Sequence, residues 1–234
     1  MNTTTKTSRV LGVAFLLQAL TSLISNAIFL NPLIVPGSIS GSMLNIANKP
    51  WLMRAYILGE NITAAGIIFL GAILFITLRK QNEKTALVAM GIYILEAALL
   101  AASTIAAFFL LHISQEFIPA GQPAYLQAMG NLALESSNFG STLAMLAFCL
   151  GAIPFYYLLD KSRIVPRVLS LWGLIAVFPC LVATLSAIFG QALPFFVYIP
   201  YAPFEFVIAI WILVKGIRDN SETKVHMVHA NATI

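Results

Sequence analysis

The chain has 234 residues, of which 59% are hydrophobic and 9% are charged. An average soluble domain has about 25% charged residues, so this composition excludes an ordinary soluble protein, and the length suits about six spans of roughly 20 residues without a separate soluble domain. The formal net charge of +4 gives no reason to expect nucleic acid as a partner, because the cations are confined to a few segments between apolar stretches.

The first apolar stretch predicts a membrane-spanning helix at about residues 10–30. Lys6 and Arg9 precede it, so a cleaved signal peptide is the alternative interpretation. The stretch is longer than the core of a signal peptide and lacks a small-residue cleavage site, which favours a retained helix. Gln18 and Ser22 share one face of this helix with Ser25, and we expect that face to point into a bundle.

Five further apolar segments predict spans at about residues 51–78, 85–111, 131–159, 168–189 and 195–214. Together they predict an all-α, polytopic bundle of six transmembrane helices in a lipid bilayer. Residues 31–50 are rich in Pro, Gly, Ser and Asn and are predicted to form a loop. Tyr156 and Tyr201 lie near predicted membrane surfaces, where amphipathic aromatic rings serve as anchors.

The distribution of cations predicts the orientation. Of the 13 Lys and Arg residues, only Lys49 and Arg54 lie on one side of the predicted bundle. The others lie in the N-terminal tail, in the second and fourth loops, at Lys215 and in the tail at residues 217–234. Because Lys and Arg are retained in the cytoplasm, we expect both termini and this polar tail to be cytoplasmic. Arg167 and Lys215 are expected to meet lipid headgroups at that surface.

A stripe of polar residues marks the span at residues 131–159. Asn131, Glu135, Asn138 and Thr142 follow one another at helical spacing and therefore share one face. Hydrocarbon penalises an exposed carboxylate by several kcal/mol. The stripe is therefore predicted to face other helices of the bundle.

Carboxyl groups within the predicted spans are the strongest indication of a functional site. Glu96 and Glu205 lie roughly 18 and 14 Å from the cytoplasmic boundary, close to the middle of the membrane. Glu60 and Glu135 lie near the outer boundary by the same reasoning. These four acids predict an acid-lined cleft that opens outward. Its other expected polar residues are Asn61, Asn131, Asn138 and Arg54, and Arg54 is the only cation at that depth.

Three roles are open for these carboxyl groups. They can be structural, because an unpaired carboxyl group in a low dielectric is expected to be protonated and to bond a neighbouring amide or hydroxyl group. They can bind a cation or exchange a proton during transport, as acids within membranes commonly do. A catalytic role is the third, although two carboxylates alone do not identify an enzyme.

Other enzymatic and metal-binding signals are weak. His112 lies near Glu116 and is a candidate metal ligand with Glu135, although a single interfacial histidine is more often only solvated or hydrogen-bonded. The sequence contains no HExxH, GxSxG or GxxxxGK[ST] motif, so zinc protease, serine hydrolase and nucleotide-driven activities lack their usual signals. We expect no cofactor, and a non-enzymatic protein is favoured over a metal-dependent membrane enzyme.

Three stretches carry a resemblance to a known family: GIYILEAALL (residues 91–100), SRIVPRVLSLWG (residues 162–173) and PFEFVIAIWILVKG (residues 203–216). They resemble a bacterial family of six-span integral membrane proteins known only as a domain of unknown function. The resemblance implies location in the bacterial cytoplasmic membrane and no established activity. It singles out Glu96, Arg167, Glu205 and Lys215 without supplying a mechanism.

Two functional hypotheses follow. The first is a small transporter or binding protein for a cation, a proton-coupled solute or an amphipathic molecule, with Glu96 and Glu205 at its midplane site and Glu60 and Glu135 at its mouth. The second is a non-catalytic membrane partner or sensor whose carboxyl groups are structural and protonated.

Overall fold

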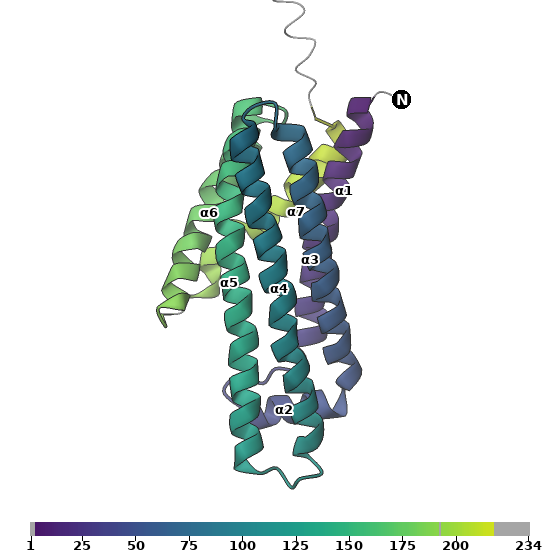
Figure 1. Cartoon of the computed structure of the whole chain (residues 1–234), viewed down its shortest axis with the longest axis vertical. Helices are drawn as coiled ribbons and strands as arrows, with labels where there is room; N and C mark the ends of the chain where they lie inside the picture. The colour runs from purple at the N-terminus through teal and green to yellow at the C-terminus, as the bar shows by residue number, and fades with distance from the viewer. Residues whose placement is uncertain (1–2, 192, 218–234) are drawn as a thin grey trace, which may run out of the picture.

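A computed structural model describes residues 3–191 and 193–217 of the chain (Figure 1). The described residues form helices and connecting turns and contain no strand, which confirms the all-α prediction. The predicted tail lies outside the described residues from residue 218 onward. The helices are α1 (Thr3–Ile24), the π-helix η1 (Ser25–Leu30), α2 (Ile39–Asn48), α3 (Pro50–Leu78), α4 (Glu83–Phe117), α5 (Ala124–Ser162), α6 (Arg167–Ile188), the 3-10 helix η2 (Phe195–Tyr198) and α7 (Ala202–Lys215).

Six helical segments are long and apolar enough to cross a membrane. The first combines most of α1 with η1, and the last combines the end of η2 with α7. Helices α4 and α5 are much longer than the others, with 35 and 39 residues. In Figure 1, α3, α4 and α5 run side by side, and α2 lies at the end opposite the N-terminus. The sequence therefore forms a six-helix bundle whose two longest members extend towards α2.

The prediction of a continuous loop at residues 31–50 is wrong, because α2 lies within it. Ser38 caps this helix by accepting a hydrogen bond from the Gly41 amide at 3.1 Å. The Ser42 hydroxyl accepts another from the Val35 amide at 2.9 Å and fastens the preceding turn. Met43 is fully buried and packs in the apolar cluster that α2 forms with α3, α4 and α5. Residues 31–50 thus contain a short amphipathic helix that is capped by a serine, and their composition alone does not predict it.

The apolar core consists of two clusters. The larger lies between α1, α3, α4, α5, α6 and α7, and the smaller lies between α2 and the adjoining ends of α3, α4 and α5. Along each of α3, α4 and α5, residues of one cluster are followed by residues of the other. Glu60 lies where α3 changes from one cluster to the other, whereas Glu96 lies on α4 within the larger cluster.

Small residues allow several of the helices to approach closely. A methyl group added at Gly173 in α6 would overlap the Phe204 ring of α7. One added at Gly151 in α5 would lie 2.7 Å from the Tyr93 ring of α4. Membrane helices associate largely through such van der Waals packing, for which small residues are favoured. These glycines therefore fix how α6 meets α7 and how α4 meets α5.

Candidate functional site

A cavity of about 540 Å³ lies among α1, α3, α4, α5, α6 and α7. Glu60 from α3, Glu96 from α4 and Glu205 from α7 all line it. Three of the four predicted acids are therefore brought together. Further polar side chains in its wall are those of Gln18, Ser22, Asn26, Thr63, Ser141, Tyr198 and Tyr201. The wall contains no Lys, Arg or His among the described residues.

Glu205 is held by donors from two helices. Gln18 Nε2 in α1 donates to Glu205 Oε1 at 2.9 Å. The Tyr201 hydroxyl, at the start of α7, donates to the same oxygen at 2.8 Å and lies 2.6 Å from the Tyr156 hydroxyl of α5. The carboxyl group thus ties α7 to α1 and α5. Gln18 is 7% exposed, which confirms the expectation that its face of the first helix points into the bundle.

The two tyrosines of this network were not predicted as site residues. Tyr156 is fully buried, so its expected role as a surface anchor is wrong. Tyr201 packs edge-on against Phe148, with ring centroids 5.0 Å apart, and lines the cavity. Aromatic residues make up 11% of the chain, so their presence in a span carries little information. Only the hydrogen bonds of their hydroxyl groups distinguish them.

Glu60 is buried and is held by an amide from the π-helix. Asn26 Nδ2 in η1 donates to Glu60 Oε1 at 3.1 Å. One turn further along α3, Thr63 donates to the Thr21 hydroxyl of α1 at 2.8 Å. The wider turn of a π-helix re-aims side chains and is frequent at functional sites. Here it places an amide of the first span against the carboxyl group of the second.

Glu96 differs from the other two carboxyl groups. Its side chain is 8% exposed, and its Oε2 atom is buried without a hydrogen-bond donor among the described residues. A buried polar group without a partner costs about 1–3 kcal/mol, and more if it is charged. The burial of the Glu96 carboxyl group is therefore not explained by hydrogen bonds within the described part of the protein.

The polar stripe of α5 lies outside this cavity. Asn131, Glu135 and Asn138 are exposed on the surface of the helix, so the prediction that they face other helices of the bundle is wrong. Asn131 Nδ2 donates to Glu135 Oε1 at 2.8 Å within the stripe itself. The buried face of α5 at this level is formed by small residues such as Ala133 and Ser137, because these permit close packing on α4.

Asn61 and Arg54 also lie outside the cavity, on exposed positions of α3. Asn61 Nδ2 donates to the Thr104 hydroxyl at 3.1 Å and so links α3 to α4. Within the described residues the only ion pair joins Arg167 to Asp160, at 3.4 Å. Arg54 therefore does not neutralise any of the cavity carboxyl groups.

Arg167 and Lys215 lie at helix ends, as predicted. Arg167 begins α6 after Pro166 and has an exposed side chain. Lys215 is the last residue of α7 and is exposed, and Gly216 follows it with a φ of 75°. A cation in the last turn is favoured by the helix dipole. Their contact with lipid headgroups stays a prediction.

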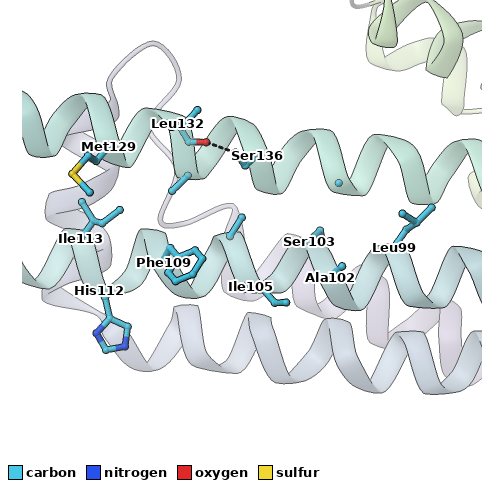
Figure 2. Close-up of a pocket in the computed structure, with 13 residues that line it drawn as sticks. Leu99, Ala102, Ser103, Ile105, Phe109, His112, Ile113, Met129, Leu132 and Ser136 are labelled. Atoms are coloured by element: carbon cyan, nitrogen blue, oxygen red, sulfur yellow. Dashed lines mark hydrogen bonds between the residues drawn. The ribbon is translucent and has the colours of Figure 1, made fainter.

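A second hollow, of about 670 Å³, runs between α4 and α5. Figure 2 shows Phe109, Ile113, Met129 and Leu132 in its largely apolar wall. His112 is exposed and directs its ring away from α5, and the ring packs edge-on against Phe108 at 4.4 Å. No group of three or more potential metal ligands occurs among the described residues. The structure therefore does not form the metal site considered for His112 with Glu116 and Glu135.

The central cavity consequently combines two carboxyl groups that accept hydrogen bonds from side-chain amides, Glu60 and Glu205, with a third, Glu96, that has a buried oxygen without a donor among the described residues. Such an arrangement suits the binding of a positively charged group or the exchange of a proton, since acids within membranes commonly mark such pathways.

The family assignment agrees with the architecture. Neither a curated protein nor a solved structure matches the chain. A family model described as "Domain of unknown function (DUF4386)" matches residues 10–216, which include all six candidate spans apart from the first two residues of the first. The chain is therefore a member of this family of uncharacterised membrane proteins.

Proposed function

We propose that this protein is a small transporter or binding protein that takes up a cation or a proton-coupled solute in the cavity between Glu60, Glu96 and Glu205. The observation that carries the proposal is that Glu96 lines the cavity and that its buried Oε2 atom has no donor among the described residues. A buried carboxyl group with no cation beside it takes up a proton rather than keep an unpaired charge. A bound cation would supply the missing partner and replace that proton.

The remaining acids support this arrangement by holding the cavity together. Glu205 joins α1 to α7 through Gln18, and Glu60 joins η1 to α3 through Asn26. Both contacts involve the first span, which also contacts α7 along its length. A shift of α1 relative to the other helices would change both carboxyl environments together, which suits a solute carrier that opens and closes around its site.

A non-catalytic membrane partner or sensor is the second candidate. It is favoured by the amide hydrogen bonds of Glu60 and Glu205, which account for these two groups structurally. The exposed stripe of Asn131, Glu135 and Asn138 provides a polar surface that such a protein would present to a partner. In this case Glu96 would be a neutral structural group.

Glu96→Gln separates the two candidates. In lipid nanodiscs at pH 8, saturating cations are expected to raise the unfolding midpoint of the wild type, because a ligand at a hundred times its dissociation constant stabilises the folded state by about 2.7 kcal/mol. The variant is expected to fold and to lose this increase. Glu135→Gln is the matched control and should keep it, because Glu135 lies outside the cavity. Equal midpoints with and without every cation in the wild type would favour the sensor.

The orientation is also part of the proposal: both termini in the cytoplasm of a bacterial cell, as the Lys and Arg distribution indicates. Lys80→Cys and Ala120→Cys place single thiols at exposed positions on opposite ends of α4. We expect a membrane-impermeant maleimide to label Ala120→Cys in intact cells and Lys80→Cys only after lysis. Cys149 and Cys180 are buried and should remain unlabelled. The opposite labelling pattern would reverse the orientation.

A further inference from the structure

The chemistry of the cavity wall restricts the kind of cation that it can hold. Glu205 Oε1 already accepts two hydrogen bonds, and Glu60 Oε1 accepts one. Of the three carboxyl groups only Glu96 has a buried oxygen without a donor among the described residues, and this side chain is more than nine-tenths buried. Glu96 is therefore the deeply placed carboxyl group of this cavity that has no hydrogen-bond donor of its own among the described residues.

A metal ion fits this arrangement poorly. Ca²⁺ requires 6–8 oxygen ligands and Mg²⁺ requires near-octahedral coordination. The carboxyl groups of the cavity lie on three different helices, and the described residues contain no group of three potential metal ligands. A carboxyl group without a donor of its own, such as Glu96, is instead suited to a charged N–H donor.

Part of the wall is apolar and aromatic. Leu100, Met145 and Phe148 from α4 and α5 line the cavity beside Glu96. The rings of Phe148 and Tyr201 form an edge-to-face pair at 5.0 Å, and aromatic faces attract ammonium groups. A volume of about 540 Å³ lies within the range of sites for small organic molecules.

We propose that the ligand is an organic ammonium ion with an apolar body, whose charged group binds Glu96 and whose body packs against Leu100, Met145 and Phe148. This inference rests on the proposed function and names the class of solute for the same site. The ammonium group supplies the hydrogen bond and charge that Glu96 lacks. The apolar body fills a wall that neither a hydrated inorganic ion nor a proton would contact.

A series of n-alkylammonium ions from methyl to hexyl tests the inference with full-length protein in lipid nanodiscs and isothermal titration calorimetry. We expect the dissociation constant to fall about fourfold for each added methylene, as burial of one methylene predicts. Glu96→Gln should weaken butylammonium binding at least tenfold, and Glu135→Gln should leave it unchanged. Titration of protein-free nanodiscs measures partition into the lipid and is subtracted. Butylammonium binding as tight in Glu96→Gln as in the wild type would overturn the inference.

Leu100→Asn provides a second variant that leaves the carboxyl group in place. It is expected to weaken hexylammonium binding at least fivefold while methylammonium binding stays the same. Butanol that binds as tightly as butylammonium would overturn the inference, because the charge would then be irrelevant. Binding of Na⁺ or K⁺ as tight as that of every amine, with no dependence on chain length, would also overturn it but would leave cation binding intact. If no cation binds at all, both this inference and the proposed function fail.

Discussion

Gly173→Val is expected to lower the free energy of unfolding by about 1–3 kcal/mol, the usual range for overfilling a packed core. The added side chain would overlap the Phe204 ring of α7. That ring is fully buried and packs edge-on against Tyr156 and Trp172, with centroids 5.1 and 5.9 Å away, so it has no space to yield. Thermal unfolding of the purified protein, followed by tryptophan fluorescence, measures the loss.

Gly91→Val is the matched control, because a side chain at Gly91 in α4 meets no atom within 4 Å. It should change stability by less than about 0.5 kcal/mol, the usual limit for surface substitutions. Adding Phe204→Leu to Gly173→Val should restore part of the loss, since the two side chains are in contact and their effects are not additive. Equal destabilisation by both glycine substitutions would indicate a helix-propensity effect instead of a steric one.

Glu205→Ala is expected to cost about 2–4 kcal/mol of stability. It leaves the buried Gln18 amide without its acceptor and removes one bond of the Tyr201 hydroxyl, and an unsatisfied buried donor costs about 1–3 kcal/mol. The cavity left by the side chain adds to this. Chemical denaturation in mixed micelles, analysed for the wild type and the variant under the same conditions, gives the difference.

Glu205→Gln retains an oxygen that accepts from both Gln18 and Tyr201, so it should cost less than about 1 kcal/mol. Glu135→Ala removes an exposed carboxyl group that accepts a hydrogen bond from Asn131, and it should be nearly neutral. A loss in Glu205→Gln as large as that in Glu205→Ala would mean that the negative charge, and not the hydrogen-bond acceptor, stabilises this site.

The fold class could be predicted because it depends on composition and length, which the sequence states directly. Apolar stretches of sufficient length require backbone hydrogen bonds to be satisfied internally, so they form helices in a membrane. Helix α2 was missed because its Ser and Asn residues also occur in loops. Its cap, Ser38, is a local contact, but the burial of Met43 depends on helices distant in the sequence.

The candidate site could be predicted only in part. Glu60, Glu96 and Glu205 stood out because each is isolated in an apolar span, and counting along a helix gives the depth of a residue. Counting does not give the direction in which the residue faces when all sides of the helix are apolar. Glu135 was therefore grouped with Glu60, although only Glu60 lines the cavity. The contribution of Tyr156 and Tyr201 depends on hydrogen bonds between distant helices and has no local signal.

The unusual length of α4 and α5 produces a hydrophobic mismatch. Their 35 and 39 residues correspond to about 52 and 58 Å, whereas the hydrocarbon layer is about 30 Å thick. Even a tilt of 40° leaves about 40–45 Å to be accommodated along the bilayer normal. Helix α6, with 22 residues, matches the layer and lies away from α2 (Figure 1). We therefore expect the ends of α4 and α5 near α2 to stand at or above the headgroups, where water can hydrate the exposed Asn131 and Glu135. Such a projection would give the protein a folded epitope outside the lipid.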